Sequence, residues 1–251
     1  MGIELKNKLN QLLLKKNPGG LYFSTWLKKN GYSDQLLKKY RESAWFSALS
    51  SGVMYRTGDK LKSFAVLNSY NDQINKNFYI AAHSALELSG FNHYVPMGKP
   101  LLVIGHPKKQ FVPSWMKKVD LDRTLKFFST ETFSKPQLST FSNEYPQLMA
   151  SIPEQAFLEC LLLAPKQYSF MDLFYIMEQL TTLRPEILQL LLENTDNIKV
   201  KRIFLYMAEK AGHYWFDSLD INKMNLGSGK HKLTEKGVYV PKYKITIPKD
   251  L

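Results

Sequence analysis

The stretch "GYSDQLLKKYRESAWFSALSSGVMYRTGD", from Gly31 to Asp59, contains two periodicities in immediate succession. In its first half Ser33 is placed to cap a helix, and apolar residues recur at helical spacing in a stripe formed by Leu36, Leu37, Tyr40 and Ala44. After Trp45 the period changes to two, and Ser51-Gly52 separates the runs "FSALS" and "VMYRT". The stretch therefore predicts a helix followed at once by a β-hairpin.

Two more helices are expected before this stretch. Residues 3–16 place apolar side chains on one helical face, namely Ile3, Leu5, Leu9, Leu12 and Leu13. The segment "STWLKKN" then predicts a short helix that Ser24 caps and Gly31 ends. Three helices followed by a hairpin are typical of a winged helix-turn-helix domain, which we expect over residues 1–60.

The polar face of the helix after Ser33 suggests a role in DNA binding. Its side chains can meet phosphates or base edges in a major groove, and the hairpin can reach an adjacent backbone or minor groove. The alternative is a small helical cap whose lysines form a solvated face. Net charge favours DNA: Lys and Arg minus Asp and Glu gives 12 − 4 = +8 for residues 1–62, 11 − 13 = −2 for residues 63–198 and 11 − 5 = +6 for residues 199–251.

Other classes of protein are disfavoured by composition. The longest apolar runs, such as "CLLLA" (160–164), fall far short of the ~20 residues of a membrane span. The N-terminus lacks the apolar core of a signal peptide, so we expect a cytoplasmic protein with no membrane partner. One cysteine, Cys160, excludes an internal disulfide and a zinc site built from cysteines.

Residues 61–251 are expected to form a second, mixed α+β domain, with a boundary anywhere between 60 and 80. Asp59 is a candidate N-cap for a helix that follows it. Strand-like segments are expected at 100–105, 123–129, 137–142 and 147–152, helices at 153–164, 169–182, 185–195 and 199–211, and a final hairpin turning at Lys236-Gly237. The fold class is thus α+β throughout, with the winged helix first.

No catalytic, metal or cofactor site is predicted. "LGSGKH" (226–231) resembles a phosphate loop but lacks the first glycine and the Ser or Thr after the lysine. "DLD" (120–122) lacks the glycine-serine pair that precedes the carboxylates of a nucleotidyltransferase. The five histidines show no metal-binding spacing. The sequence therefore favours a binding protein over an enzyme.

A second basic region is expected in the last quarter of the chain. Its candidate residues are Lys199, Lys201, Arg202, Lys210, Lys230 and Lys232. The helix "IKVKRIFLYMAEKA" turns its apolar residues to the core, and its cations are expected in solvent. This region is either a solvated face or a docking surface for RNA or another acidic partner.

The chain also resembles a known family over nearly its whole length and in the same order. The residues that carry the resemblance are the run "FSTWLKKNGYSDQLLKKYRESAWFSALSSGVMYRTGD", then "AAHSALELSGF", "SIPEQAFLECLLLAP", "LTTLRPEILQLLLE", "VKRIFLYMAEKAGHYWF" and "LGSGKHKL". They resemble the AbiEi antitoxins of bacterial type IV toxin–antitoxin systems. One departure is Gln155, where the family commonly has an arginine.

The resemblance implies a protein with two functions. The winged helix-turn-helix of such antitoxins binds inverted repeats in double-stranded DNA of its own promoter and represses transcription. The C-terminal domain counters a nucleotidyltransferase-like toxin without needing a stable complex. On this chain, recognition would fall to Ser33, Gln35, Lys38, Lys39 and Arg41, with Ser51 and Arg56 at the wing.

Overall fold

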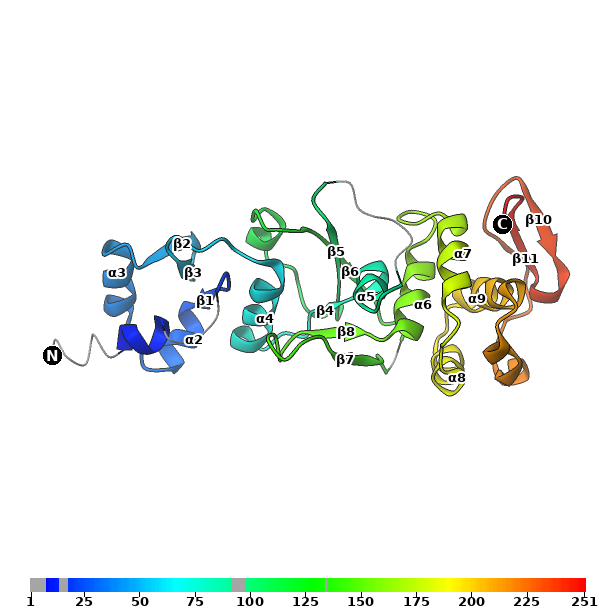
Figure 1. Ribbon diagram of the computed structural model, residues 1–251, viewed down its shortest axis with the longest axis horizontal. Coiled ribbons are helices and arrows are strands. Elements are labelled where there is room, and N and C mark those ends of the chain that lie inside the picture. The colour runs from blue at the N-terminus through cyan, green and yellow to red at the C-terminus, as the bar shows by residue number, and fades with distance from the viewer. Residues whose placement is uncertain (1–7, 14–17, 92–97, 134) are drawn as a thin grey trace. The chain divides into compact units, whose positions relative to one another are not determined.

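The computed structural model describes residues 8–13, 18–91, 98–133 and 135–251. The chain forms two compact units, each built from segments that are distant in sequence. The first comprises Met1–Asn77, Phe111–Thr124 and Ser142–Leu148, and the second comprises Phe78–Gln110, Leu125–Phe141 and Met149–Leu251. Figure 1 gives the order of the elements along the chain.

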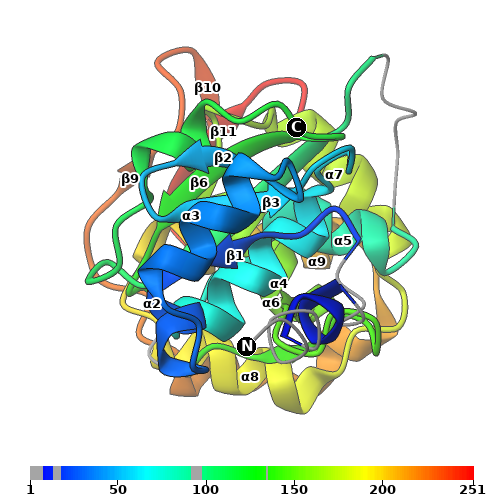
Figure 2. The same cartoon turned by 90° about the vertical axis from the view of Figure 1, so that its left-hand side faces the viewer.

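The first unit contains the predicted winged helix-turn-helix. Its elements are β1 (Tyr22–Phe23), α2 (Ser24–Lys29), α3 (Asp34–Glu42), β2 (Phe46–Ser50), β3 (Val53–Arg56), α4 (Ser63–Ile74) and the short 3-10 helix η1 (Ser114–Lys117). The hairpin β2–β3 gains a third strand, so the sheet order is β1-β3-β2, with all pairs antiparallel. Figure 2 gives a second view of α2, α3 and this sheet.

The core of the winged helix joins all three predicted helices to the sheet. Of the first predicted helix, residues 8–13 are described and helical, and Leu12 is buried against Leu27, Leu37 and Phe46 in one cluster. Residues 3–7 and 14–16 of that prediction lie outside the described residues. Because the cluster draws on every element, none of these short helices has to be stable alone.

Three capping details of the first unit differ from the predictions. Phe23, not Ser24, is the N-cap of α2, because β1 runs directly into the helix. Ala44 does not extend the apolar stripe of α3: it is exposed, lies beyond the helix end, and has a positive φ of 57°. Asp59 does not cap α4, which begins at Ser63. The Ser63 N–H instead donates to Asp122 Oδ1 at 2.7 Å.

The second unit is built on a five-stranded sheet in the order β6-β5-β4-β8-β7. The strands are β4 (Tyr79–Ile80), β5 (Leu101–His106), β6 (Thr124–Ser129), β7 (Leu138–Thr140) and β8 (Met149–Ser151). β4 pairs antiparallel with β5 and parallel with β8. Helices α5 (Ala82–Leu88) and α6 (Pro153–Leu163) pack together beside it.

The rest of the second unit is helical until a last small sheet. Helices α7 (Phe170–Gln179), α8 (Pro185–Asn194) and α9 (Ile198–Ala211) lie close to the predicted ranges, and 3-10 helices η2 (Tyr214–Ser218) and η3 (Ile221–Lys223) follow. α6 packs on α9, and Cys160 is fully buried in α6. The α+β fold class, with the winged helix first, is confirmed.

The final sheet differs from the predicted hairpin. Its strands β9 (His231–Lys232), β10 (Gly237–Val240) and β11 (Ile245–Pro248) are ordered β10-β11-β9. The hairpin turn is the 3-10 helix η4 (Pro241–Tyr243) with Lys244, not Lys236-Gly237. Gly237 instead pairs with Pro248, where a Cβ would lie 2.0 Å from the Ile247 carbonyl oxygen. Close strand approach, not a turn, requires this glycine.

Candidate nucleic-acid interface

Helix α3 is set at its N-terminus by Ser33. The Ser33 Oγ accepts from the Leu36 N–H at 3.2 Å, which confirms the predicted cap. Asp34 follows in the first turn, where a carboxylate favours the helix dipole, and it pairs with Lys28 of α2 at 2.7 Å. The first turn of α3 is therefore tied to the helix that precedes it.

The inner face of α3 fixes how the helix is presented. Leu36, Leu37 and Tyr40 are buried, and the Tyr40 ring lies 6.1 Å from the Phe46 ring at the start of the hairpin. Tyr22 of β1 meets Phe46 edge to face at 5.3 Å. Because α3 is packed on one side against β1 and β2, the opposite side must face solvent.

The polar face carries the predicted recognition residues. Gln35, Lys38, Lys39 and Arg41 are all exposed. Lys38 lies 3.7 Å from the Glu42 carboxylate, a long and solvent-screened ion pair. Within the described part of the chain, neither Lys39 nor Arg41 has a carboxylate within ion-pair distance. On the exposed side of the helix Gln35 and Lys39 are i,i+4 neighbours, and Arg41 lies at the other edge of the same side.

Of the two predicted wing residues, Arg56 lies near the end of this helix and Ser51 does not. Arg56 pairs with Phe46, just past the end of α3, where the Trp45 N–H donates to the Tyr40 carbonyl. Ser51 lies at the other end of β3, at the turn whose Gly52 carbonyl accepts from Ser24 N–H. Both are exposed. Arg56 thus extends the basic face of α3, and Ser51 lies at the wing tip, about 17 Å away along an extended strand.

Trp45 is a surface residue that sequence reasoning missed. Its side chain is 46% exposed at the junction of α3 and β2, and its carbonyl accepts from the Thr57 N–H beside Arg56. The sequence analysis used Trp45 only to mark the change of period. An exposed tryptophan among cations is the signal that would have added it to the candidate interface.

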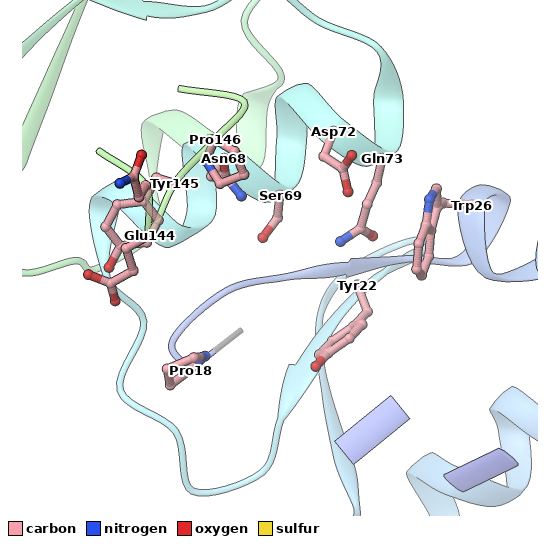
Figure 3. Close-up of a pocket in the computed structure, with 11 residues that line it drawn as sticks. Pro18, Tyr22, Trp26, Asn68, Ser69, Asp72, Gln73, Glu144, Tyr145 and Pro146 are labelled. Atoms are coloured by element: carbon pink, nitrogen blue, oxygen red, sulfur yellow. The ribbon is translucent and has the colours of Figure 1, made fainter. Parts of the chain in front are cut away.

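A cavity of about 360 Å³ lies elsewhere on the first unit (Figure 3). Ser69 and Gln73 of α4 project toward Tyr22 and Trp26 in this cavity. Asp72 and Glu144 also line it. Two carboxylates repel phosphate, so this hollow is not part of a nucleic-acid interface.

The predicted basic surface of the second unit is only partly correct. Lys201 and Arg202 are each 1% exposed and are not surface residues. Their charged groups donate to backbone carbonyls of residues 225–229 and to Lys244, which satisfies them without water. The helix pattern could not show this because the acceptors lie some 24 residues further along the chain.

Of the other four predicted cations, Lys210, Lys230 and Lys232 are exposed as predicted, and Lys199 is half-buried. Lys199 donates to the Ala164 carbonyl at 2.7 Å, and burial lowers its pKa. Lys210 donates to the Leu251 carbonyl and lies over the Phe174 ring. Lys232 is paired with Glu235. Three of the six predicted cations are therefore exposed.

A buried carboxylate organises the centre of the second unit. Glu159 is fully buried and accepts from Tyr79 Oη, the Ala82 N–H, Ser151 Oγ and Gln155 Nε2, at 2.8–3.1 Å. Burial raises the pKa of Glu159 to about 7, although these hydrogen bonds act to lower it. Gln155, the departure from the family pattern, is thus a neutral member of a structural network.

Asp122 and His213 make structural contacts. Asp122 serves as an acceptor at the start of α4, and His213 stacks on Trp215 while its Nε2 lies 2.6 Å from the Met177 carbonyl. Among the described residues no three His, Cys, Asp or Glu side chains are grouped closely enough to hold a metal ion. Over the same residues, no helix is both long and apolar enough to span a bilayer.

Comparison with known proteins gives two family matches that together cover most of the chain. The model described as "Transcriptional regulator, AbiEi antitoxin N-terminal domain" matches residues 5–97, and the model described as "Transcriptional regulator, AbiEi antitoxin, Type IV TA system" matches residues 99–248. No curated protein matches.

Among solved structures, the fold is similar to the RV2827C protein from Mycobacterium tuberculosis. The TM-score is 0.64 at 15% identity, over 96% of this chain and 90% of that chain. At this identity the similarity concerns the fold alone. The two family matches carry the assignment further, and the chain belongs to the AbiEi family of antitoxin transcriptional regulators of type IV toxin–antitoxin systems.

Proposed function

We propose that this regulator binds inverted repeats in the promoter of its own operon and represses transcription. The observation that carries the proposal is the exposed polar face of α3, which presents Gln35, Lys39 and Arg41 on a helix whose other face is packed into the winged-helix core. In helix-turn-helix proteins the second helix enters the major groove, and Gln, Lys and Arg are suited to base edges and phosphates.

The parts of the interface have different roles in this proposal. Arg41 and Gln35 are placed to read base edges, while Lys38 and Lys39 neutralise phosphates and Ser33 approaches the backbone at the helix start. Arg56, beside the end of α3, and Ser51, at the wing tip, contact the flanking backbone. We assign this role to the winged helix-turn-helix within residues 1–60 and the antitoxin role to the second unit, which omits the parts of residues 61–251 that belong to the first unit.

The second unit, in this proposal, counters a nucleotidyltransferase-like toxin without a stable complex. The family assignment supports a toxin as the functional partner. In this proposal the protein acts by binding and not as an enzyme. Because its target would be chromosomal DNA, we place it in the bacterial cytoplasm.

A reporter assay tests the proposal in cells. The operon's own promoter drives a reporter, and the full chain is supplied in trans as wild type, as Lys39→Ala/Arg41→Ala, or as Lys126→Ala. Lys126 is exposed on β6, and its substitution controls for the loss of one of the two charges that the double variant removes. Repression should fall in the double variant and persist in Lys126→Ala. Equal repression by all three proteins would refute the role of α3.

The same variants separate the two functions. Lys39→Ala/Arg41→Ala should still protect cells from a toxin encoded in the same operon, because both residues belong to the first unit. If protection and repression are lost together while the variant folds normally, the proposed division of labour is wrong.

A further inference from the structure

The glycine-rich loop "NLGSGK" (225–230) is held in place by two buried cations. Arg202 Nε donates to the Leu226 carbonyl at 2.8 Å, Nη2 to Gly227 at 3.0 Å, and Nη1 to Gly229 at 2.7 Å. Lys201 Nζ reaches the Asn225 carbonyl at 3.1 Å. Four carbonyls of the loop therefore point toward these two buried cations. They belong to Asn225, Leu226, Gly227 and Gly229.

Several N–H groups of the loop are left for a ligand. Gly227 N–H is used by Asn225 Oδ1 at 2.9 Å. Among the residues that the structure describes, the N–H groups of Ser228, Gly229 and Lys230 have no acceptor, and all three residues are exposed. A loop whose carbonyls point inward and whose N–H groups are unused is chemically suited to an anion.

Positive charge in this region is only partly compensated, since the more distant carboxylates of Asp196 and Glu193 act on Lys201 and Glu235 pairs with Lys232. In the described part of the chain neither Lys201 nor Arg202 has a carboxylate within 4 Å. Their hydrogen-bond acceptors are backbone carbonyls, which carry no net charge. Two buried positive charges thus lie directly beneath the loop, and Lys230 and Lys244 add exposed charge next to it. An anion bound outside the loop would complete this arrangement.

An aromatic side chain accompanies the charge. Tyr239 on β10 is 39% exposed, and the Lys230 ammonium lies 5.1 Å from its ring centroid. Next to it Val238 is 51% exposed, and β10 is an edge strand of its sheet. Exposed aromatic rings beside lysines are the means by which proteins hold unstacked bases and the phosphates that join them.

We propose that the loop 225–230, with Lys232 and Tyr239, is a binding site for single-stranded nucleic acid. The loop N–H groups and Lys230 bind phosphate oxygens, and Tyr239 stacks on a base. A single strand fits better than a duplex, whose bases are not free to stack on Tyr239. A polymer fits better than a mononucleotide because the loop is an open surface, and a polyanion gains affinity from several shallow contacts.

This site is separate from the DNA interface proposed above, since every residue in it belongs to the second unit. It also gives the lysines that remain exposed in this region a specific function. "LGSGKH" is therefore a phosphate-binding loop without being a Walker-type nucleotide site, whose lysine and hydroxyl pattern it lacks.

The test is a fluorescence-anisotropy titration of the full chain with a labelled 20-nucleotide RNA of mixed sequence, a DNA strand of the same sequence, and the matching DNA duplex. All variants carry Lys39→Ala/Arg41→Ala, which disables the proposed DNA face of the first unit. Onto this background we place Lys230→Ala, Tyr239→Ala or, as the charge-matched control, Lys126→Ala. Thermal melting confirms that each protein is folded.

Lys230→Ala should weaken RNA binding by about three- to tenfold and lower the salt slope by about 0.7. Tyr239→Ala should weaken it by about five- to a hundredfold, with little change in the salt slope. Lys126→Ala should stay within about twofold of its background, since it is remote from the loop. Lys230→Arg should restore binding.

Three results would overturn the proposal. Equal losses in Lys230→Ala and Lys126→Ala would mean that only net charge matters. RNA binding that survives both Lys230→Ala and Tyr239→Ala would place the site elsewhere. Equal affinity for the single strands and for the DNA duplex would show attraction to phosphate without stacking on Tyr239. None of these results bears on promoter binding, which the first unit is proposed to provide.

Discussion

The Ser33 hydroxyl oxygen accepts a hydrogen bond from the Leu36 N–H at 3.2 Å, at the first turn of the proposed recognition helix. The same turn places Leu36 and Leu37 in the core and leaves Gln35 outside. A single cap therefore sets both the start of α3 and the direction in which its polar residues point.

Replacing Ser33 by alanine should destabilise the first unit by about 1 kcal/mol, because the Leu36 N–H loses its acceptor. Ser33→Asn should be close to neutral, since asparagine caps as well as serine does. Denaturant unfolding of the three proteins measures this. If Ser33→Asn is as unstable as Ser33→Ala, the hydroxyl has a role other than capping.

Lys38 and Lys39 should differ in their effect on DNA binding. Lys38 already faces Glu42 at 3.7 Å, whereas Lys39 has no carboxylate partner in the described residues. Lys39→Ala should lower the salt slope of DNA binding by about 0.9, the value for one lost phosphate contact. Glu42→Gln should strengthen binding by freeing Lys38 and removing a negative charge. Weaker binding of Glu42→Gln would contradict this picture of the interface.

Glu159 should make the second unit more stable in mild acid. Burial raises its pKa from 4.5 to about 7, so the folded state holds the proton more tightly than the unfolded chain does. The resulting stabilisation is fully present below about pH 4.5 and is lost as pH rises through about 7, with a total on the order of 3 kcal/mol.

Chemical denaturation at several pH values measures the contribution of Glu159. Glu159→Gln should flatten the change in stability between pH 4.5 and 7, since glutamine does not titrate. Glu144→Gln, at an exposed position, is the matched control and should leave the pH profile as it is. An unchanged profile in Glu159→Gln would mean that this carboxyl group titrates normally.

Arg184 and Glu154 should be coupled in stability. Arg184 binds both carboxylate oxygens of Glu154 at 2.9 Å, and Glu154 is 2% exposed. Burial alone would raise the pKa of Glu154, but the hydrogen bonds from Arg184 outweigh it and lower the pKa. Arg184→Ala should cost about 1–3 kcal/mol because a buried carboxylate loses its partner.

A double-mutant cycle with Glu154→Gln checks this pair. The double variant should be less destabilised than the sum of the two single variants, since the buried charge is absent from it. Stability in the wild type should also fall as pH drops through the lowered pKa of Glu154, and this loss should be smaller in Glu154→Gln. Additive effects in the cycle would show that the two residues act independently.

The winged helix was predictable because its signals are local. The Ser33 cap, the stripe of Leu36, Leu37 and Tyr40, and Ser51-Gly52 between alternating runs each depend on neighbours in sequence. β1 was missed because it has only two residues, and its strand character comes from pairing with β3 some thirty positions away.

The candidate sites were predictable only where exposure followed from periodicity. Lys39 and Arg41 lie on the polar side of a clearly amphipathic helix, and they are exposed as expected. Lys201 and Arg202 sit in a helix with the same kind of pattern but are buried, because a distant loop supplies carbonyls to them. Hydrogen bonds between a cation and carbonyls so distant in sequence cannot be predicted from the residues around the cation.

The most direct test of the central claim is a binding titration of the full chain against its own upstream DNA and a scrambled duplex, at two salt concentrations. The account predicts that the upstream fragment is preferred, that the preference survives the higher salt, and that Lys39→Ala/Arg41→Ala removes it. Equal and equally salt-sensitive binding to both duplexes would show only nonspecific attraction to phosphate and would contradict the proposed autorepressor.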